Sequence, residues 1–282
     1  MRIWEGRLRT ALVLIPALSL FIAYSSSLLF FLLVAGGIGI AQHEFYRFFF
    51  RNRATRAIFV GLALGFLVVS SFYSRVETTA SSLPDIILSL VILSLLLFQL
   101  FFHQNLQDTL VDTSVILLGV LYVGWLLGHL VLLRGLSHGR SFIFFLLLVT
   151  WAGDAGAYYF GKTMGRRKLY VGVSPNKTVA GAIGGWIVSL ASALGSKFLF
   201  LPMLSVKDAL LLGALLGIVG QIGDLAESMI KRSAGVKDSG SLVPSHGGLL
   251  DKVDSLAFNA PVLFYYLWLV KGYGYGPFTL TL

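Results

Sequence analysis

The chain has 282 residues, of which 56% are hydrophobic and only 12% charged; its formal net charge is +9 and it has no cysteine. A soluble domain carries about twice that charged fraction, so a soluble globular, disordered or fibrous protein is excluded. The absence of cysteine also excludes disulfides, thiolate nucleophiles and Cys-ligated zinc. The composition predicts an integral membrane protein with several spans.

Apolar segments recur along the whole chain, and roughly 20 residues are enough to cross a bilayer. We predict about nine spans, at residues 11–24, 27–46, 57–73, 84–102, 110–133, 141–161, 179–202, 208–230 and 252–270. The first is the weakest because it is short and contains Pro16, but no small-x-small cleavage site follows it, so it is kept as a span. Runs such as residues 86–102 show no alternation of period two. The predicted fold class is therefore all-α, a polytopic transmembrane helical bundle.

The distribution of Lys and Arg predicts the orientation of this bundle. With a cytoplasmic N-terminus, 16 of the 22 basic residues fall in inner segments, as the positive-inside rule expects. The positive charge then reflects topology, and no nucleic acid partner is predicted. Residues 1–139 form an apolar N-terminal half, and residues 140–282 form a half with acidic spans and two cytoplasmic loops.

Acidic residues within the predicted spans point to chemistry, because ionisable groups are costly at membrane depth. Five of them fall near the cytoplasmic side of three spans: Asp154, Asp224, Glu227, Asp251 and Asp254. Helical spacing places Asp224 and Glu227 on one face with Lys231. Hard carboxylate oxygens without cysteine favour Mg²⁺. The alternative is that these acids only pair with Lys or Arg between helices, and this stays open for Glu227 and Asp154.

Other acids are expected to have local roles. Glu44 and His43 lie at the cytoplasmic end of the second span beside Arg47, so a local ion pair is favoured over a site. Asp108 and Asp112 flank the fifth span and are expected to mark its end.

Two predicted cytoplasmic loops, residues 161–178 and 231–248, combine basic side chains with Gly, Ser and Thr. Lys177 and Thr178 lie just before a helix N-terminus, which is a ready anion site. Each loop alone also fits a flexible positive-inside loop, but beside metal-type acids the two together indicate a polyphosphate site. His246 could donate to phosphate, act as an acid–base group or brace the loop.

One run of this chain closely resembles the signature of the phosphatidate cytidylyltransferases, the CDP-diacylglycerol synthases: Ser228-x-Ile230-Lys231-Arg232-x4-Lys237-Asp238-x-Gly240-x2-Val243-Pro244-x-His246-Gly247-Gly248-Leu249-x-Asp251-Lys252-Val253-Asp254. Three further runs resemble motifs of that family: Asp154-x2-Ala157-Tyr158-x2-Gly161, Ser174-Pro175-x-Lys177-Thr178-x2-Gly181 and Gly223-Asp224-x2-Glu227-Ser228. The chain departs from the family at Lys252, where Arg is usual, and at Ala180, where Glu is frequent. Lys252 keeps the charge but loses the bidentate fork of Arg.

The resemblance implies an Mg²⁺-dependent transfer of CMP from CTP to phosphatidate at the cytoplasmic face of a bacterial inner membrane, in phospholipid biosynthesis. The implied catalytic residues are Asp224, Asp251, Asp254, Lys231 and His246. The implied substrate and phosphate ligands are Ser174, Lys177, Thr178, Ser228, Arg232, Lys237, Asp238, Gly247, Gly248 and Lys252. The metal ligands are Asp224, Asp251 and Asp254, with Glu227 and Asp154 as further candidates and a second cation as an open point. A homodimer is also implied.

Two alternatives remain. A CTP-dependent lipid-alcohol kinase or a CDP-archaeol synthase would share the same broad features, and substrate screening would separate them. A cation-coupled transporter also places acids in its spans, but it predicts midplane acids and paired internal repeats. No such repeat is visible in this sequence.

Overall fold

The computed structural model describes residues 16–50, 55–78, 82–103, 105–240 and 247–275. These residues form two compact units. Unit 1 comprises the described parts of residues 1–137, 238–250 and 275–282, and unit 2 comprises residues 138–237 and 251–274. Of the described residues in the second half of the chain, residues 238–240, 247–250 and 275 belong to unit 1.

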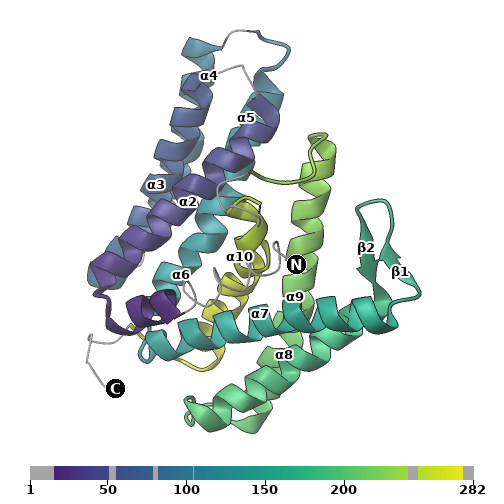
Figure 1. The fold of residues 1–282 in the computed structure, drawn as a ribbon. Helices are drawn as coiled ribbons and strands as arrows, with labels where there is room; N and C mark the ends of the chain where they lie inside the picture. Colours follow the sequence, from purple (N-terminus) through teal and green to yellow (C-terminus); the bar gives the residue numbers. More distant parts are fainter. Residues whose placement is uncertain (1–15, 51–54, 79–81, 104, 241–246, 276–282) are drawn as a thin grey trace. The chain divides into compact units, whose positions relative to one another are not determined.

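Unit 1 is built from long apolar helices (Figure 1). They are α2 (Ser27–Phe50), α3 (Thr55–Thr78), α4 (Leu83–Phe102), α5 (Thr109–Leu118) and α6 (Leu126–Gly135). The π-helix η1 (Gly119–Trp125) joins α5 to α6 without a break. Tyr46 of α2 donates a hydrogen bond to the Ile116 carbonyl at 3.0 Å, and Gln42 donates to the Gly119 carbonyl at 3.1 Å. These bonds fix α2 against the stretch where the helical pattern changes.

Unit 2 consists of α7 (Gly139–Met164), α8 (Val179–Leu199), α9 (Val206–Ser233), α10 (Leu250–Tyr265) and the π-helix η2 (Tyr266–Val270), with the first residue of α10 assigned to unit 1. Between α7 and α8 the chain forms a short antiparallel hairpin of β1 (Lys168–Tyr170) and β2 (Ser174–Thr178) (Figure 1). The sequence predicted a loop here. Strand propensity does not indicate the hairpin, because β2 contains Pro175, Asn176 and Lys177, which are uncommon in strands.

Within the described residues, eight helices are long and apolar enough to cross a membrane. Each coincides with a predicted span, and this confirms the predicted polytopic all-α fold class. The fourth of them, which matches the fifth predicted span, is the continuous stretch from Thr109 to Gly135, and the last runs from Leu250 to Val270. The first predicted span, 11–24, lies partly outside the described residues, and its described part from residue 16 is helical.

Glycines allow α7 and α8 to pack closely. A Cβ at Gly185 would lie 2.9 Å from both the Ala157 Cβ and the Gly153 carbonyl oxygen. Beside them, Ser189 donates a hydrogen bond to the Val149 carbonyl at 3.2 Å. Small residues and a hydroxyl bond are typical of tight helix pairs in membranes. This packing holds α7, which carries Asp154, against α8, which begins just after Lys177 and Thr178.

Replacing Gly185 by Leu is therefore expected to lower the free energy of unfolding by about 1–3 kcal/mol, the usual cost of overpacking a close contact. Thermal unfolding of the purified protein in detergent measures the change. Gly195, also on α8, is the matched control, because a Cβ there would meet no atom within 4 Å. Equal unfolding temperatures for Gly185→Leu and Gly195→Leu would contradict the close contact.

A polar cluster joins the start of α9 to the segment that follows α10. The Ser205 side chain caps α9 and forms a reciprocal capping box with Asp208. Asp208 also accepts a hydrogen bond from the Tyr266 hydroxyl at 2.7 Å and forms an ion pair with Lys271 at 2.8 Å. This cluster fixes the start of α9 against the end of the last span within unit 2.

Candidate active site

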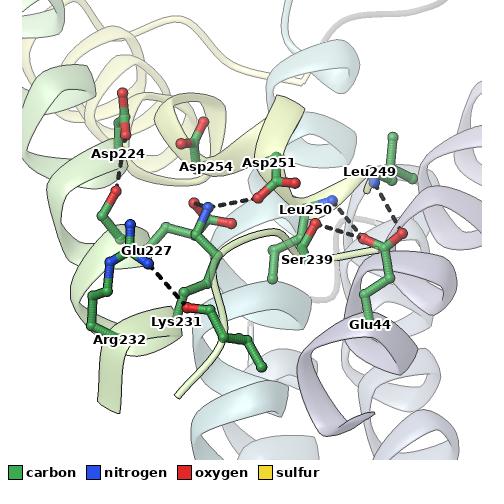
Figure 2. Close-up of polar contacts among 12 residues, drawn as sticks. Glu44, Asp224, Glu227, Lys231, Arg232, Ser239, Leu249, Leu250, Asp251 and Asp254 are labelled. Carbon is green, nitrogen blue, oxygen red and sulfur yellow. Dashed lines mark hydrogen bonds and ion pairs between the residues drawn. The ribbon is translucent and has the colours of Figure 1, made fainter. Parts of the chain in front are cut away.

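The helices and hairpin of unit 2 position the acidic and basic residues of the candidate site. Asp154 lies on α7, and Lys177 and Thr178 end strand β2. Asp224, Glu227 and Lys231 follow one another on α9 at helical spacing, and Asp251 and Asp254 lie in the first turns of α10 (Figure 2). Four separate elements therefore supply the charged groups of this site.

The first ion pair joins the hairpin to α9. Lys177 Nζ lies 2.8 Å from Asp224 Oδ2, and both side chains are partly exposed. Ser228 Oγ donates a long hydrogen bond of 3.5 Å to the other oxygen of Asp224. Because the pair is not sealed from solvent, either partner can exchange the other for a bound ligand.

The second cluster joins α9 to α10 through one lysine. Lys231 Nζ lies 2.6 Å from Glu227 Oε2 and 2.6 Å from Asp251 Oδ1 (Figure 2). Glu227 is 1% exposed, so its charge depends on this partner. Glu227 thus pairs with a lysine of its own helix, one turn away, and not with a described basic residue of another helix.

Asp254 has a different environment, because the charged groups that act most strongly on it are also acids. It is 8% exposed, and Asp224, Glu227 and Asp154 all act on it electrostatically. The Ser255 N–H donates a hydrogen bond to its Oδ1 at 2.7 Å. Among the described residues, no Lys or Arg forms an ion pair with Asp254. Like charges gathered around a buried carboxylate are best offset by a cation.

The oxygen-only donor set fits a hard divalent cation. In the described part of the chain, however, no three His, Asp or Glu side chains converge closely enough to hold one ion as they stand. The reason lies in the pairs just described, because Lys177 holds Asp224 and Lys231 holds Asp251. A cation could bind these acids only in competition with the two lysines.

A cavity of about 480 Å³ opens beside the first ion pair. Its lining comes from α7, the hairpin, α8 and α9, and includes Asp154, Tyr158, Lys162, Asn176, Lys177, Thr178, Gln221 and Asp224. The cavity therefore offers acids, lysines and neutral hydrogen-bonding groups together, in a volume typical of small-molecule sites. Sequence reasoning did not single out Asn176, and it included Tyr158 only in a family motif and not among the expected ligands.

Several predicted phosphate ligands make contacts within unit 2 that limit their freedom. Thr178 is the N-cap of α8 and accepts a hydrogen bond from the Gly181 N–H at 3.1 Å. Arg232 donates to the Val173 carbonyl at 3.5 Å and to the Val236 carbonyl at 3.4 Å. Lys237 and Lys252 are exposed, and Ser174 is half-buried.

Other predicted site residues lie elsewhere in the chain. Asp238, Gly247 and Gly248 belong to unit 1. Gly247 has a φ of 86°, a conformation that favours glycine. His246 lies outside the described residues, so its three predicted roles stay open.

Glu44 corrects one expectation. The sequence predicted a local pair with Arg47, but the Glu44 carboxylate accepts hydrogen bonds from Ser239, Leu249 and Leu250 instead. All of these residues belong to unit 1. The sequence shows only an acid in an otherwise apolar span. That pattern cannot reveal hydrogen-bond partners 195 to 206 residues away.

Comparison with known proteins agrees with the chemistry of these residues. A model of the cytidylyltransferase family matches residues 5–270. A phosphatidate cytidylyltransferase of Bacillus subtilis (strain 168) is 34% identical over 259 residues, which cover 90% of this chain and 94% of that protein. The phosphatidate cytidylyltransferase of Staphylococcus haemolyticus (strain JCSC1435) is 41% identical over 175 residues, 62% of this chain and 66% of its own length. That of Staphylococcus aureus (strain COL) is 39% identical over 177 residues, with the same shares of each chain.

Proposed function

The chain belongs to the cytidylyltransferase family, and from this premise we propose that it transfers CMP from CTP to phosphatidate. The products are CDP-diacylglycerol and pyrophosphate. The observation that carries the proposal is the pairing of lysines with carboxylates in Lys177–Asp224 and Glu227–Lys231–Asp251. Apart from Lys177, which lies on strand β2, these residues belong to helices long and apolar enough to cross a membrane. Acids and lysines in this arrangement suit a reaction between anionic phosphates, which needs charge neutralisation and alignment more than covalent catalysis.

The bonds that change define what the residues must do. A phosphate oxygen of phosphatidate forms a bond to the α-phosphorus of CTP, and the bond from that phosphorus to the bridging oxygen of the β-phosphate breaks. The electron pair leaves with pyrophosphate. Because the nucleophile is already an anion, the chain needs no strong base. Lys177 and Lys231 can offset the charge that develops on the leaving pyrophosphate.

We propose that Asp224, Asp251 and Asp254 hold Mg²⁺, with Glu227 and Asp154 as further ligands or as the site of a second cation. When bound, Mg²⁺ would offset the charge of the triphosphate and activate the α-phosphate toward attack. The support for this assignment is the buried carboxylate of Asp254, whose charged neighbours are other acids. The lysines would then be released from Asp224 and Asp251 to meet phosphate.

We also propose an inner-membrane location with the site facing the cytoplasm, where CTP is found, and assembly as a homodimer. The orientation rests on the excess of Lys and Arg in the predicted inner segments. Labelling of single introduced cysteines in intact cells tests it, since the chain has no cysteine of its own. The mass of the detergent-solubilised particle tests the dimer.

A turnover assay tests the function directly. Purified protein in detergent should convert labelled CTP and phosphatidate to CDP-diacylglycerol, and removal of divalent cations by EDTA should reduce turnover to background. Restoring Mg²⁺ should recover it in a saturable way. Isoprenols and archaeal ether-lipid phosphates serve as comparison substrates. Turnover of one of these without turnover of phosphatidate would replace the proposed reaction with the related kinase or CDP-archaeol synthesis.

A further inference from the structure

Glu44 of α2 is a buried acid that bonds both ends of one loop. The residue is 7% exposed. Its carboxylate accepts hydrogen bonds from Ser239 Oγ at 3.3 Å, from the Leu249 N–H at 3.0 Å and from the Leu250 N–H at 2.9 Å (Figure 2). Ser239 lies at the start of the loop and Leu249 at its end. One side chain therefore sets the separation of these two points in unit 1.

The two backbone donors belong to the start of α10, which begins at Leu250. The first N–H groups of a helix have no partner within the helix, and a Ser, Thr, Asp or Asn beside them usually supplies one. Here the preceding residues are Gly248 and Leu249, which carry no such acceptor. The Glu44 carboxylate provides it from another helix, and its negative charge also suits the positive end of the helix dipole.

Glu44 is itself held in place. Gln42 and Tyr46, two residues before and after it, bond the carbonyls of Gly119 and Ile116. Two residues turn an α-helix by about 200°, so these anchors lie on the side of α2 away from Glu44. Within unit 1, the anchors fix the face of α2 that presents the carboxylate.

The loop backbone approaches the carboxylate so closely that side chains are excluded. A Cβ at Gly248 would lie 2.5 Å from Glu44 Oε2, and one at Gly240 would lie 2.9 Å from Glu44 Oε1. Gly248 was predicted to allow close approach of a ligand. In unit 1 its missing side chain also makes room for Glu44 and Ser239.

We propose that Glu44 is a positioning residue for the acids at the start of α10, an inference that rests on the proposed function. Leu250, whose N–H it binds, is followed directly by Asp251, and Asp254 comes one turn later. Each residue of an α-helix turns by about 100°. If the helix began one position earlier or later, the first turn would present both carboxylates in a different direction. Glu44 selects the residue at which α10 begins.

The test compares Glu44→Gln and Glu44→Leu with the wild-type protein in detergent. Glu44→Gln keeps one acceptor oxygen and loses the charge, and Glu44→Leu loses both. Hydrogen exchange of the backbone between residues 249 and 254 reports the start of α10. The Mg²⁺ concentration that gives half-maximal thermal stabilisation reports the acids without any turnover. The CTP-plus-phosphatidate assay is run in parallel, and Glu77→Gln is the matched control, an exposed acid in unit 1 that bonds Ser27 of α2.

We expect Glu44→Leu to speed hydrogen exchange in this segment and to raise the half-saturating Mg²⁺ concentration about 10- to 100-fold, the range typical of residues that orient metal ligands. Glu44→Gln should fall between it and the wild type, and Glu77→Gln should match the wild type. Unchanged exchange in Glu44→Leu would overturn the proposal. So would a lower unfolding temperature with an unchanged Mg²⁺ requirement, which marks a purely structural residue. If the wild type binds Mg²⁺ but does not turn over phosphatidate, the proposed function fails, while exchange and Mg²⁺ binding still decide the role of Glu44.

Discussion

Replacing Asp254 by Asn is expected to reduce turnover at least about 100-fold, because a proposed metal ligand should matter no less than the groups that orient it. The burial of Asp254 leads to a second expectation for the same variant, on its unfolding temperature. Asp254 is buried among the acids Asp224, Glu227 and Asp154, so the neutral amide relieves repulsion between like charges. Without divalent cations, Asp254→Asn should therefore unfold at a temperature equal to or higher than that of the wild type.

The two effects have opposite signs, and this separates a metal ligand from a residue that only maintains the fold. Turnover and thermal unfolding are measured on the same preparation, with EDTA and with saturating Mg²⁺. The stabilisation by Mg²⁺ should be large in the wild type and small in Asp254→Asn. Asp85→Asn, an exposed acid in the first turn of α4, is the control for loss of a carboxylate. Near-wild-type turnover in a folded Asp254→Asn protein would remove Asp254 from the metal site.

Hydrophobic length predicts the spans of this protein because the bilayer imposes one requirement on every crossing segment. The helix from Leu83 to Phe102 was predicted to within one residue at its start. The spacing of Asp224, Glu227 and Lys231 likewise predicted a shared face, and the Glu227–Lys231 pair lies on it. Features of this kind depend on neighbouring residues in the chain, so the sequence records them directly.

Contacts between distant segments leave a weaker record in the sequence. Lys177 could have paired with any of several acids, and only folding of the hairpin places it at Asp224. The partners of Glu44 lie 195 to 206 residues away, so a local rule assigned it to Arg47. The π-helices η1 and η2 lie inside continuous apolar stretches, so composition does not separate them from the α-helices beside them.

Lys231 links the stability of unit 2 to its chemistry, and replacing it by Met is expected to impair both. Its ammonium group is the partner of Glu227, which is 1% exposed, at 2.6 Å. Removing one member of a buried ion pair leaves the other charge without compensation, at a cost of about 3–5 kcal/mol in the free energy of unfolding. Denaturant or thermal unfolding in detergent measures this loss. Lys207→Met is the matched control, because Lys207 is an exposed lysine in the first turn of the same helix.

Loss of stability alone would also abolish activity, so the catalytic part of the prediction needs a second variant. In Glu227→Gln/Lys231→Met the buried acid is neutral, and the double variant should regain most of the stability that Lys231→Met loses. Its turnover of CTP and phosphatidate should remain at least about 100-fold below that of the wild type, since the Lys231 ammonium that would offset charge on the leaving pyrophosphate is lost. Glu227→Gln alone should stay folded and keep measurable turnover, because Lys231 still pairs with Asp251 at 2.6 Å. If the stable double variant instead worked at the wild-type rate, Lys231 would serve only to neutralise Glu227, and the phosphate contact would have to come from Lys177.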